Sequence, residues 1–230
     1  MRKSIVTDAL SDLLFTPSED ADENLLREGI PLLKIKRVGN IMIDTLVVQL
    51  DKTRHCKSYG RFGLKPKEYV FVTLHRPSNV DNKTSLSIIM ECLTRLSENL
   101  PIVLPAHPRT RKTLMEFGLW QESNNSRRLI LCEPLGYRET ISLADKAQFV
   151  LTDSGGVQEE TTFLKIPCLT LRPNTERPIT ITQGTNKLTS LETLEQDFDC
   201  VLNGYRPSGR IPDLWDGKTA ERIIEILAGS

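Results

Sequence analysis

A regular alternation of short apolar strands and amphipathic helices constrains the fold of this chain more than any other feature. Five apolar runs have the length and composition of buried β-strands. These runs are Tyr69–Leu74, Ile102–Pro105, Leu129–Cys132, Phe149–Thr152 and Cys168–Leu171. Helical patterns lie between them at Lys83–Glu98, Thr110–Gly118, Tyr137–Lys146 and Gly156–Leu164. This alternation predicts a Rossmann-like α/β domain, with a parallel sheet covered by helices on both faces.

The segments on either side of the alternation carry shorter patterns. Ser18 is expected to cap a helix that ends at Gly29, because acidic residues follow the serine and glycine is a common stop. Leu32–Ile35 is a candidate strand, and Gly39-Asn40 is expected to turn into an apolar run. A last amphipathic helix is expected at Gly217–Leu227.

Charge and cysteine content exclude several classes of protein. Thirty Lys and Arg balance thirty Asp and Glu, which argues against nucleic-acid binding by bulk charge and against a polybasic membrane module. No apolar run approaches the roughly 18 residues of a membrane span. The five cysteines are widely spaced and include no CxxC pair, which predicts reduced thiols in a cytoplasmic protein and no zinc site or other metal site.

Polar residues with useful chemistry directly follow each predicted strand. In strand order they are His75 and Arg76, His107, Glu133, Asp153 to Gly156, and Arg172. Ligands of open parallel sheets bind beyond the carboxyl ends of the strands, so we expect a site there. A lone histidine is more often structural, but its place beside Arg76 favours His75 as a general acid–base or a phosphate donor.

The fourth strand runs through Asp153 and Ser154 into two glycines and then directly into a helix. Gly155 and Gly156 would let a ligand approach the backbone, and the free amides of a helix N-terminus suit a diphosphate. A plain helix cap by Asp153 or Ser154 is an equally good interpretation of these residues alone. Glu160, about one turn further along the helix, is placed to accept hydrogen bonds from sugar hydroxyls, although a solvated helix residue is the simpler interpretation.

The loop after the fifth strand is basic at both ends. Arg172 and Arg177 flank a proline-stiffened segment that contains Glu176, and two arginines there could clamp phosphates. The alternative is an Arg–Glu pair on a surface loop. The residues 183–186 are expected to form a turn whose polar groups face the same end of the sheet.

Several familiar enzyme motifs are absent from these turns. The serine turn around Ser154 does not have the G-x-S-x-G spacing of a serine hydrolase. The sequence also contains neither a Walker A lysine nor a G-x-G-x-x-G motif, so nicotinamide and ATP lose support as ligands.

Five motifs, taken in their order and spacing, resemble the non-hydrolysing UDP-N-acetylglucosamine 2-epimerases. The motifs are the run from Val72 to Asn79, Glu133-Pro134-Leu135, the run from Leu151 to Glu160, Thr175-Glu176-Arg177-Pro178 and Gly184-Thr185-Asn186. The resemblance covers essentially the whole chain, but only the C-terminal portion, rather more than half, of a full-length member. It implies the C-terminal half of a GT-B-like fold of two Rossmann-like halves, with a UDP-sugar in the cleft between them.

The resemblance also implies a reaction and the residues that serve it. The family interconverts UDP-GlcNAc and UDP-ManNAc by eliminating UDP across C1–C2 and adding it back, without a cofactor. By position, Ser154, Gly155 and Gly156 would hold the diphosphate, and Glu160 would take the ribose hydroxyls. Arg177 and the catalytic candidate His75 would neutralise charge on the departing UDP. Further candidates at this site are Arg76, Asp153 and Glu176.

Two departures from the family pattern bear on function. The family commonly has H-R-R-E-N where this chain has His75-Arg76-Pro77-Ser78-Asn79, so the glutamate of that motif has no counterpart. The carboxylates that move the C2 proton belong to the family's N-terminal half, which this chain largely lacks. The resemblance thus implies an N-terminal domain remnant at 1–48, a linker at 49–66, a UDP-binding domain at 67–212 and a helix at 213–230 that would return to the N-terminal domain.

Three hypotheses on function follow. In the first, the chain is a UDP-GlcNAc 2-epimerase or the nucleotide-binding subunit of an epimerase encoded in two pieces. In the second, it is an inactive module that binds UDP or a UDP-N-acetylhexosamine. In the third, it is a GT-B-type transferase or a hydrolysing relative. Expected partners are a separately encoded N-terminal half and further copies of the chain. Self-association is expected because the segment up to Val48, together with Trp215, Ile223, Ile224 and Leu227, would expose apolar surface.

Overall fold

The computed structural model describes residues 2–123, 126–205 and 209–229. The chain divides into two compact units, one formed by Met1–Leu50 with Ile211–Ser230 and the other by Asp51–Arg210.

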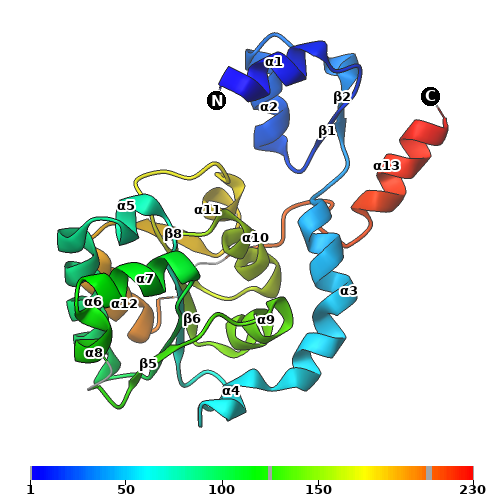
Figure 1. Ribbon diagram of the computed structural model, residues 1–230. Helices are drawn as coiled ribbons and strands as arrows, with labels where there is room; N and C mark the ends of the chain where they lie inside the picture. The colour runs from blue at the N-terminus through cyan, green and yellow to red at the C-terminus, as the bar shows by residue number, and fades with distance from the viewer. Residues whose placement is uncertain (1, 124–125, 206–208, 230) are drawn as a thin grey trace. The chain divides into compact units, whose positions relative to one another are not determined.

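The larger unit contains a six-stranded parallel sheet (Figure 1). Its strands are β3 (Val70–Thr73), β4 (Ile102–Pro105), β5 (Leu129–Cys132), β6 (Phe149–Thr152), β7 (Cys168–Leu171) and β8 (Asn186–Thr189). Five of them confirm the predicted strands, and β8 was not predicted. The strand order is β5-β4-β3-β6-β7-β8, so the chain builds outward from β3 to β5 and then returns to add β6 beside β3. The order reverses between β3 and β6, which is where ligands bind in sheets of this kind.

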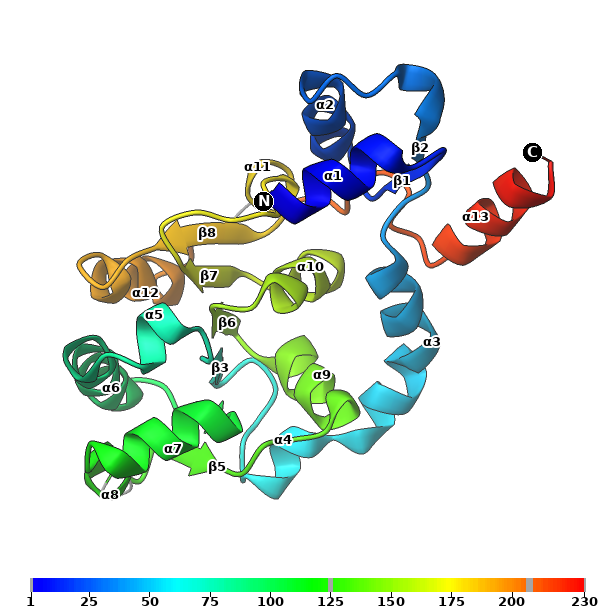
Figure 2. The same ribbon diagram turned by 45° about the horizontal axis from the view of Figure 1, so that its top comes forward.

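Helices cover both faces of this sheet (Figure 2). They are α4 (Ser58–Arg61), α5 (Pro77–Val80), α6 (Lys83–Ser97), α7 (Pro108–Glu116), α8 (Leu119–Ser123), α9 (Tyr137–Lys146), α10 (Gly155–Leu164), α11 (Ile179–Thr182) and α12 (Leu194–Leu202). The four predicted helices correspond to α6, α7, α9 and α10 to within two residues at each end. Alternate side chains along β3 enter opposite cores: Val70 and Val72 pack with α6 and α12, whereas Phe71 and Tyr69, the residue before the strand, pack with α9 and α10.

The structure corrects the expected position of residues 183–186. Asn186 begins β8 and pairs with Cys168, the first residue of β7, so the segment lies at the amino end of the sheet and not at the carboxyl end. A strand parallel to β7 requires the chain to cross back to that end first. The Nδ2 of Asn186 donates to the carbonyl oxygen of Gln158 (3.0 Å) and to Oγ1 of Thr162 (2.9 Å), so this residue joins β8 to α10.

The smaller unit contains a two-stranded parallel sheet and short helices. Its elements are α1 (Arg2–Leu10), β1 (Leu14–Thr16), α2 (Glu19–Arg27), the 3₁₀ helix η1 (Leu32–Lys34), β2 (Ile35–Arg37), the first part of α3 (Ile41–Cys56) and α13 (Thr219–Ala228). Ser18 is at the N-cap of α2, although its side chain makes no capping bond, and Gly29 ends the turn with φ +86°. The predicted strand Leu32–Ile35 is wrong, because a 3₁₀ turn with two exposed leucines follows Pro31 and the strand begins only at Ile35.

Apolar side chains of the smaller unit are partly exposed, as predicted. Ile224 and Leu227 of α13 are 65% and 56% exposed. Trp215 corrects the prediction, since it is only 2% exposed and its Nε1 donates to the carbonyl oxygen of Pro17 (2.8 Å). The carboxylate of Asp44 accepts the N–H groups of the first two residues of α13 and so supplies that helix with a distant cap.

The segment 49–66, expected to be a linker, is helical for most of its length, because α3 continues to Cys56 and α4 covers Ser58–Arg61.

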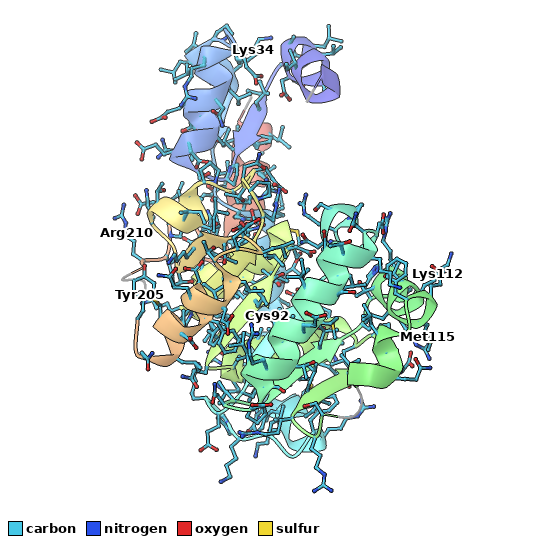
Figure 3. The ribbon with its side chains drawn as sticks, turned by 90° about the vertical axis from the view of Figure 1, so that its left-hand side faces the viewer. Lys34, Cys92, Lys112, Met115, Tyr205 and Arg210 are labelled. Carbon is cyan, nitrogen blue, oxygen red and sulfur yellow. The ribbon has the colours of Figure 1, made fainter. Side chains whose placement is uncertain are left out.

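All five cysteines are free thiols. Cys92 is buried on α6 and is labelled in Figure 3. The same view labels Tyr205, whose ring centroid lies 5.6 Å from Nζ of Lys187. Within the described ranges, no helix has both the length and the apolar character needed to cross a membrane.

Candidate functional site

The residues after β3 and β6 meet at the point where the strand order reverses. The two strands pair in register up to Thr73 and Thr152, whose hydroxyl oxygens lie 2.6 Å apart. Beyond these two threonines, β3 is followed by His75, and β6 is followed by Asp153 and Ser154. The structure therefore brings two of the predicted strand-end motifs together.

The carboxylate of Asp153 joins these two strand ends. It is fully buried and accepts the backbone N–H groups of His75 (3.1 Å) and Arg76 (2.9 Å). Its Oδ1 lies 2.9 Å from Nδ1 of His75, and its Oδ2 accepts from Nδ2 of Asn79 (3.0 Å). The same amide group of Asn79 lies 3.1 Å from the carbonyl oxygen of Leu171, which extends the network to β7.

Asn79 is a site residue that sequence reasoning did not single out. It was noted only as the end of the His75 motif. Its signal was the spacing, because Pro77 starts a helical turn at α5 and this turn brings the fourth residue after His75 back over the strand end.

The N-terminus of α10 has no side-chain cap. Ser154 is at the N-cap position but its side chain makes no capping bond, and its N–H donates to Oγ1 of Thr152 (3.0 Å). The carboxylate of Asp153 bonds to the β3 side of the site instead. The capping interpretation thus lacks its hydrogen bond. The first N–H groups of α10, from Gly155 onward, have no carbonyl of their own helix to bond, and they lie at its positive end.

The structure places one anion against this helix end. A Cβ atom added to Gly155 would lie 3.1 Å from Oε1 of Glu176. The Glu176 carboxylate also bonds to Nη2 of Arg76 (3.0 Å) and to Arg172. Partial burial alone would raise the pKa of Glu176, but the Arg172 hydrogen bond and the charges of Arg172 and Arg76 lower it to about 2. The environment therefore stabilises negative charge strongly.

Arg172 forms a pair with Glu176, as the alternative interpretation expected, but the arginine itself is buried and does not lie on the surface. Its side chain is 8% exposed, and its Nη1 is buried with no hydrogen-bond partner in the described part of the chain. Arg177 is more exposed, and its Nε lies 2.7 Å from Oε1 of the buried Glu159 on α10. The loop is further tied to α10 by Thr175, whose hydroxyl donates to Oε1 of Gln158 (2.7 Å). Two cations are thus held at the same helix end.

Glu160 is a buried carboxyl group and not a solvated helix residue. Burial is the main reason that its pKa is raised to about 7; the negative charge of Glu159 adds to the effect, and a hydrogen bond from Tyr137 opposes it. Burial also raises the pKa of Tyr137 well above its ordinary value, with a contribution from Glu160. A carboxyl group with a pKa near neutrality, in contact with a phenol, can accept hydrogen bonds from hydroxyl groups of a ligand.

A pocket opens beside the helix end, over the carboxyl ends of the strands. Its lining is Phe71, Thr73, Leu74, His75, Pro105, His107, Pro134, Leu135, Thr140, Ser154 and Val157. The lining combines an apolar floor with the polar groups of His75, His107 and Ser154, and the two histidine rings have centroids 5.7 Å apart. In the described ranges, no group of three or more His, Cys, Asp or Glu side chains is arranged to hold a metal ion.

Comparisons with known proteins identify the family of the chain. A family model described as UDP-N-acetylglucosamine 2-epimerase matches residues 3–228. The chain belongs to this family. A UDP-N-acetylglucosamine 2-epimerase from Methanocaldococcus jannaschii is 40% identical over 97% of this chain and 62% of its own length. The crystal structure of the M. jannaschii enzyme in complex with UDP-GlcNAc and UDP has a TM-score of 0.86 over 98% of this chain and 63% of that one.

Another curated relative is an epimerase of a different nucleotide sugar. A UDP-2,3-diacetamido-2,3-dideoxy-D-glucuronate 2-epimerase from Pseudomonas aeruginosa is 35% identical over 91% of this chain and 61% of its own length. The chain therefore spans less than two thirds of the length of these curated relatives. The family match and the structural similarity establish the GT-B-like α/β fold.

Proposed function

We propose that this chain supplies the UDP-binding part of a UDP-GlcNAc 2-epimerase, which converts UDP-GlcNAc to UDP-ManNAc. One observation carries the proposal: His75, Arg76 and Arg172 converge with the uncapped N-terminus of α10 where the strand order reverses, at a place that already stabilises a carboxylate. A diphosphate has the charge and the acceptor oxygens for such a place.

The proposed roles follow from position and chemistry. The amides of Gly155 and Gly156 bind the diphosphate together with the side chain of Ser154, whose own N–H is engaged by Oγ1 of Thr152. Glu160 accepts hydrogen bonds from the ribose. His75 and Arg177 stabilise the charge that grows on UDP as the C1–O bond breaks. The pocket beside Ser154 takes an uncharged part of the ligand. In this proposal Arg76 and Glu176 adjust the charge around the diphosphate.

Proton transfer at C2 is proposed to need groups from the part of the relatives that this chain does not span. The smaller unit supports this proposal, because Leu33, Val48 and Ile224 expose apolar side chains and the sheet of β1 and β2 has only two strands. Such a surface is suited to packing against a further domain. The chain would then act with a complementary N-terminal half, in the same polypeptide or in another.

Calorimetric titration with UDP tests the binding role. We expect the unmutated chain to bind UDP and Arg177→Ala to weaken that binding at least tenfold, since a charge-assisted hydrogen bond contributes about 1.5–3 kcal/mol. The matched control is Arg128→Ala, because Arg128 precedes β5 at the opposite end of the sheet. Failure of the unmutated chain to bind UDP at millimolar concentration would overturn the proposal.

Proton NMR of UDP-GlcNAc in deuterated buffer tests the epimerase reaction. We expect the C2 proton signal to persist with this chain alone and to disappear, as UDP-ManNAc forms, once the N-terminal part of a relative is added. The same experiment with UDP-2,3-diacetamido-2,3-dideoxy-D-glucuronate, the substrate of the P. aeruginosa relative, tests the competing substrate. Loss of the C2 signal with the chain alone would show that it supplies its own base.

The raised pKa of Glu160 predicts how UDP affinity depends on pH. Ribose hydroxyls donate to the ionised carboxylate, and the pKa of Glu160 is about 7, so binding releases a proton and affinity rises between pH 6 and pH 8. The UDP phosphate also titrates in this range, so the measured quantity is the difference between the unmutated chain and Glu160→Gln. Equal pH dependence in both proteins would remove Glu160 from the ribose site.

A further inference from the structure

Asp153 is a charged group that cannot touch a ligand, because its side chain is fully buried. Its two oxygens receive two backbone N–H groups, the amide of Asn79 and the Nδ1 of His75. Burial alone would raise the pKa of Asp153, but the hydrogen bonds from His75, Arg76 and Asn79 lower it below its usual value. The buried group is therefore a carboxylate, and a buried carboxylate that does not face the pocket must act through a neighbour.

His75 is the neighbour that reaches the pocket. Its side chain is 41% exposed and lines the pocket together with Ser154. The hydrogen bond that one ring nitrogen makes decides which nitrogen carries the proton. An ionised carboxylate can only accept, so Nδ1 of His75 carries a hydrogen, and Nε2 is the nitrogen left to face the ligand.

We propose that Asp153 is the positioning residue for His75: it holds the ring by Nδ1–H and presents Nε2 to the diphosphate. With Nδ1 anchored, protonation of Nε2 produces an imidazolium whose charge the carboxylate balances, and its Nε2–H donates to a phosphate oxygen. The neighbouring charged and titratable groups are Arg76 after β3, His107 after β4, and Arg172 with Glu176 after β7. None of these neighbours contacts the carboxylate of Asp153 through its side chain; within the described residues, the side chains that do are those of His75 and the uncharged Asn79. The inference rests on the proposed binding of UDP.

The first test measures the tautomer of His75 in the unmutated chain and uses a variant only for assignment. The chain has three histidines, His55, His75 and His107, so ¹⁵N-histidine labelling gives three imidazole patterns, and His75→Gln assigns one of them. We expect the neutral ring of His75 to carry its hydrogen on Nδ1. A neutral ring with hydrogen on Nε2 and none on Nδ1 would overturn the proposal, whatever the chain's affinity for UDP. The tautomer measurement tests the role of Asp153, and UDP binding by the unmutated chain tests the proposed function. Either result can therefore contradict its own proposal without the other.

The second test is a double-mutant cycle on UDP affinity. We expect Asp153→Asn and His75→Gln each to weaken UDP binding about 10- to 100-fold, and the double variant to be no weaker than His75→Gln alone. Uridine, which lacks the diphosphate, should bind all four proteins equally. Asp197→Asn is the matched control, because this buried carboxylate pairs with Lys187 away from the strand ends. Additive losses in the cycle, or loss of uridine binding with Asp153→Asn, would show that Asp153 maintains the fold and does not act through His75.

Discussion

Gly156→Ala is expected to weaken UDP binding about 10- to 100-fold while leaving the fold intact. A Cβ atom at position 156 would meet nothing within 4 Å, and the residue is not among those with positive φ. Alanine is favoured over glycine in a helix by about 1 kcal/mol, so the variant should be as stable as the unmutated chain or slightly more stable. Nothing in the described part of the chain requires glycine at position 156.

In the proposed complex with UDP, the ligand supplies the reason for this glycine. A methyl group at the N-terminus of α10 would keep a diphosphate from reaching the helix amides, each of which contributes about 1.5–3 kcal/mol to a charged acceptor. Calorimetry with UDP and urea unfolding measure the two effects separately. Gly60→Ala on α4 is the matched control, since its Cβ would also meet nothing within 4 Å, and its UDP affinity should not change. Unchanged affinity in Gly156→Ala would mean that the diphosphate binds elsewhere.

The central sheet could be predicted from the sequence because its information is local. Runs such as Phe149–Thr152 are apolar throughout and end in polar residues, so both their type and their boundaries were readable. The residues at the strand ends were found by the same rule. The convergence of His75 with Asp153 then followed from the pairing of β3 with β6.

What could not be predicted depends on tertiary contacts. β8 contains one apolar residue, Leu188, and is a strand because it pairs with β7 and because Asn186 is bonded to α10. Trp215 was assigned to an exposed face because no local pattern reveals its hydrogen bond to Pro17, 198 residues away. The side-chain partners of Asp153 and Glu176 were equally invisible, since they follow β3 and β7, the two strands that flank β6 in the sheet.

Gly184→Ala is expected to lower the free energy of unfolding of the larger unit by about 3 kcal/mol. A Cβ atom there would lie 2.4 Å from the carbonyl oxygen of Thr180 and 2.5 Å from Oγ1 of Thr162. Both neighbours are fully buried, and the Thr162 hydroxyl also accepts from Asn186, so neither can move away cheaply. Overpacking of this kind costs about 1–3 kcal/mol or more. Urea unfolding gives the magnitude.

Gly156 and Gly184 both lie in the motifs that resemble the epimerase family, but we expect Gly156 to be required by the ligand and Gly184 by packing. Gly184 lies at the amino end of the sheet, so UDP affinity of the folded Gly184→Ala protein should match that of the unmutated chain. Removing the Thr162 contacts with Thr162→Ala should recover part of the loss, so that the double variant is more stable than the sum of the single effects predicts. Additive losses would mean that the Thr162 clash is not what makes position 184 a glycine. Retained UDP affinity in Gly184→Ala, set against its loss in Gly156→Ala, would separate a glycine required by packing from one required by the ligand.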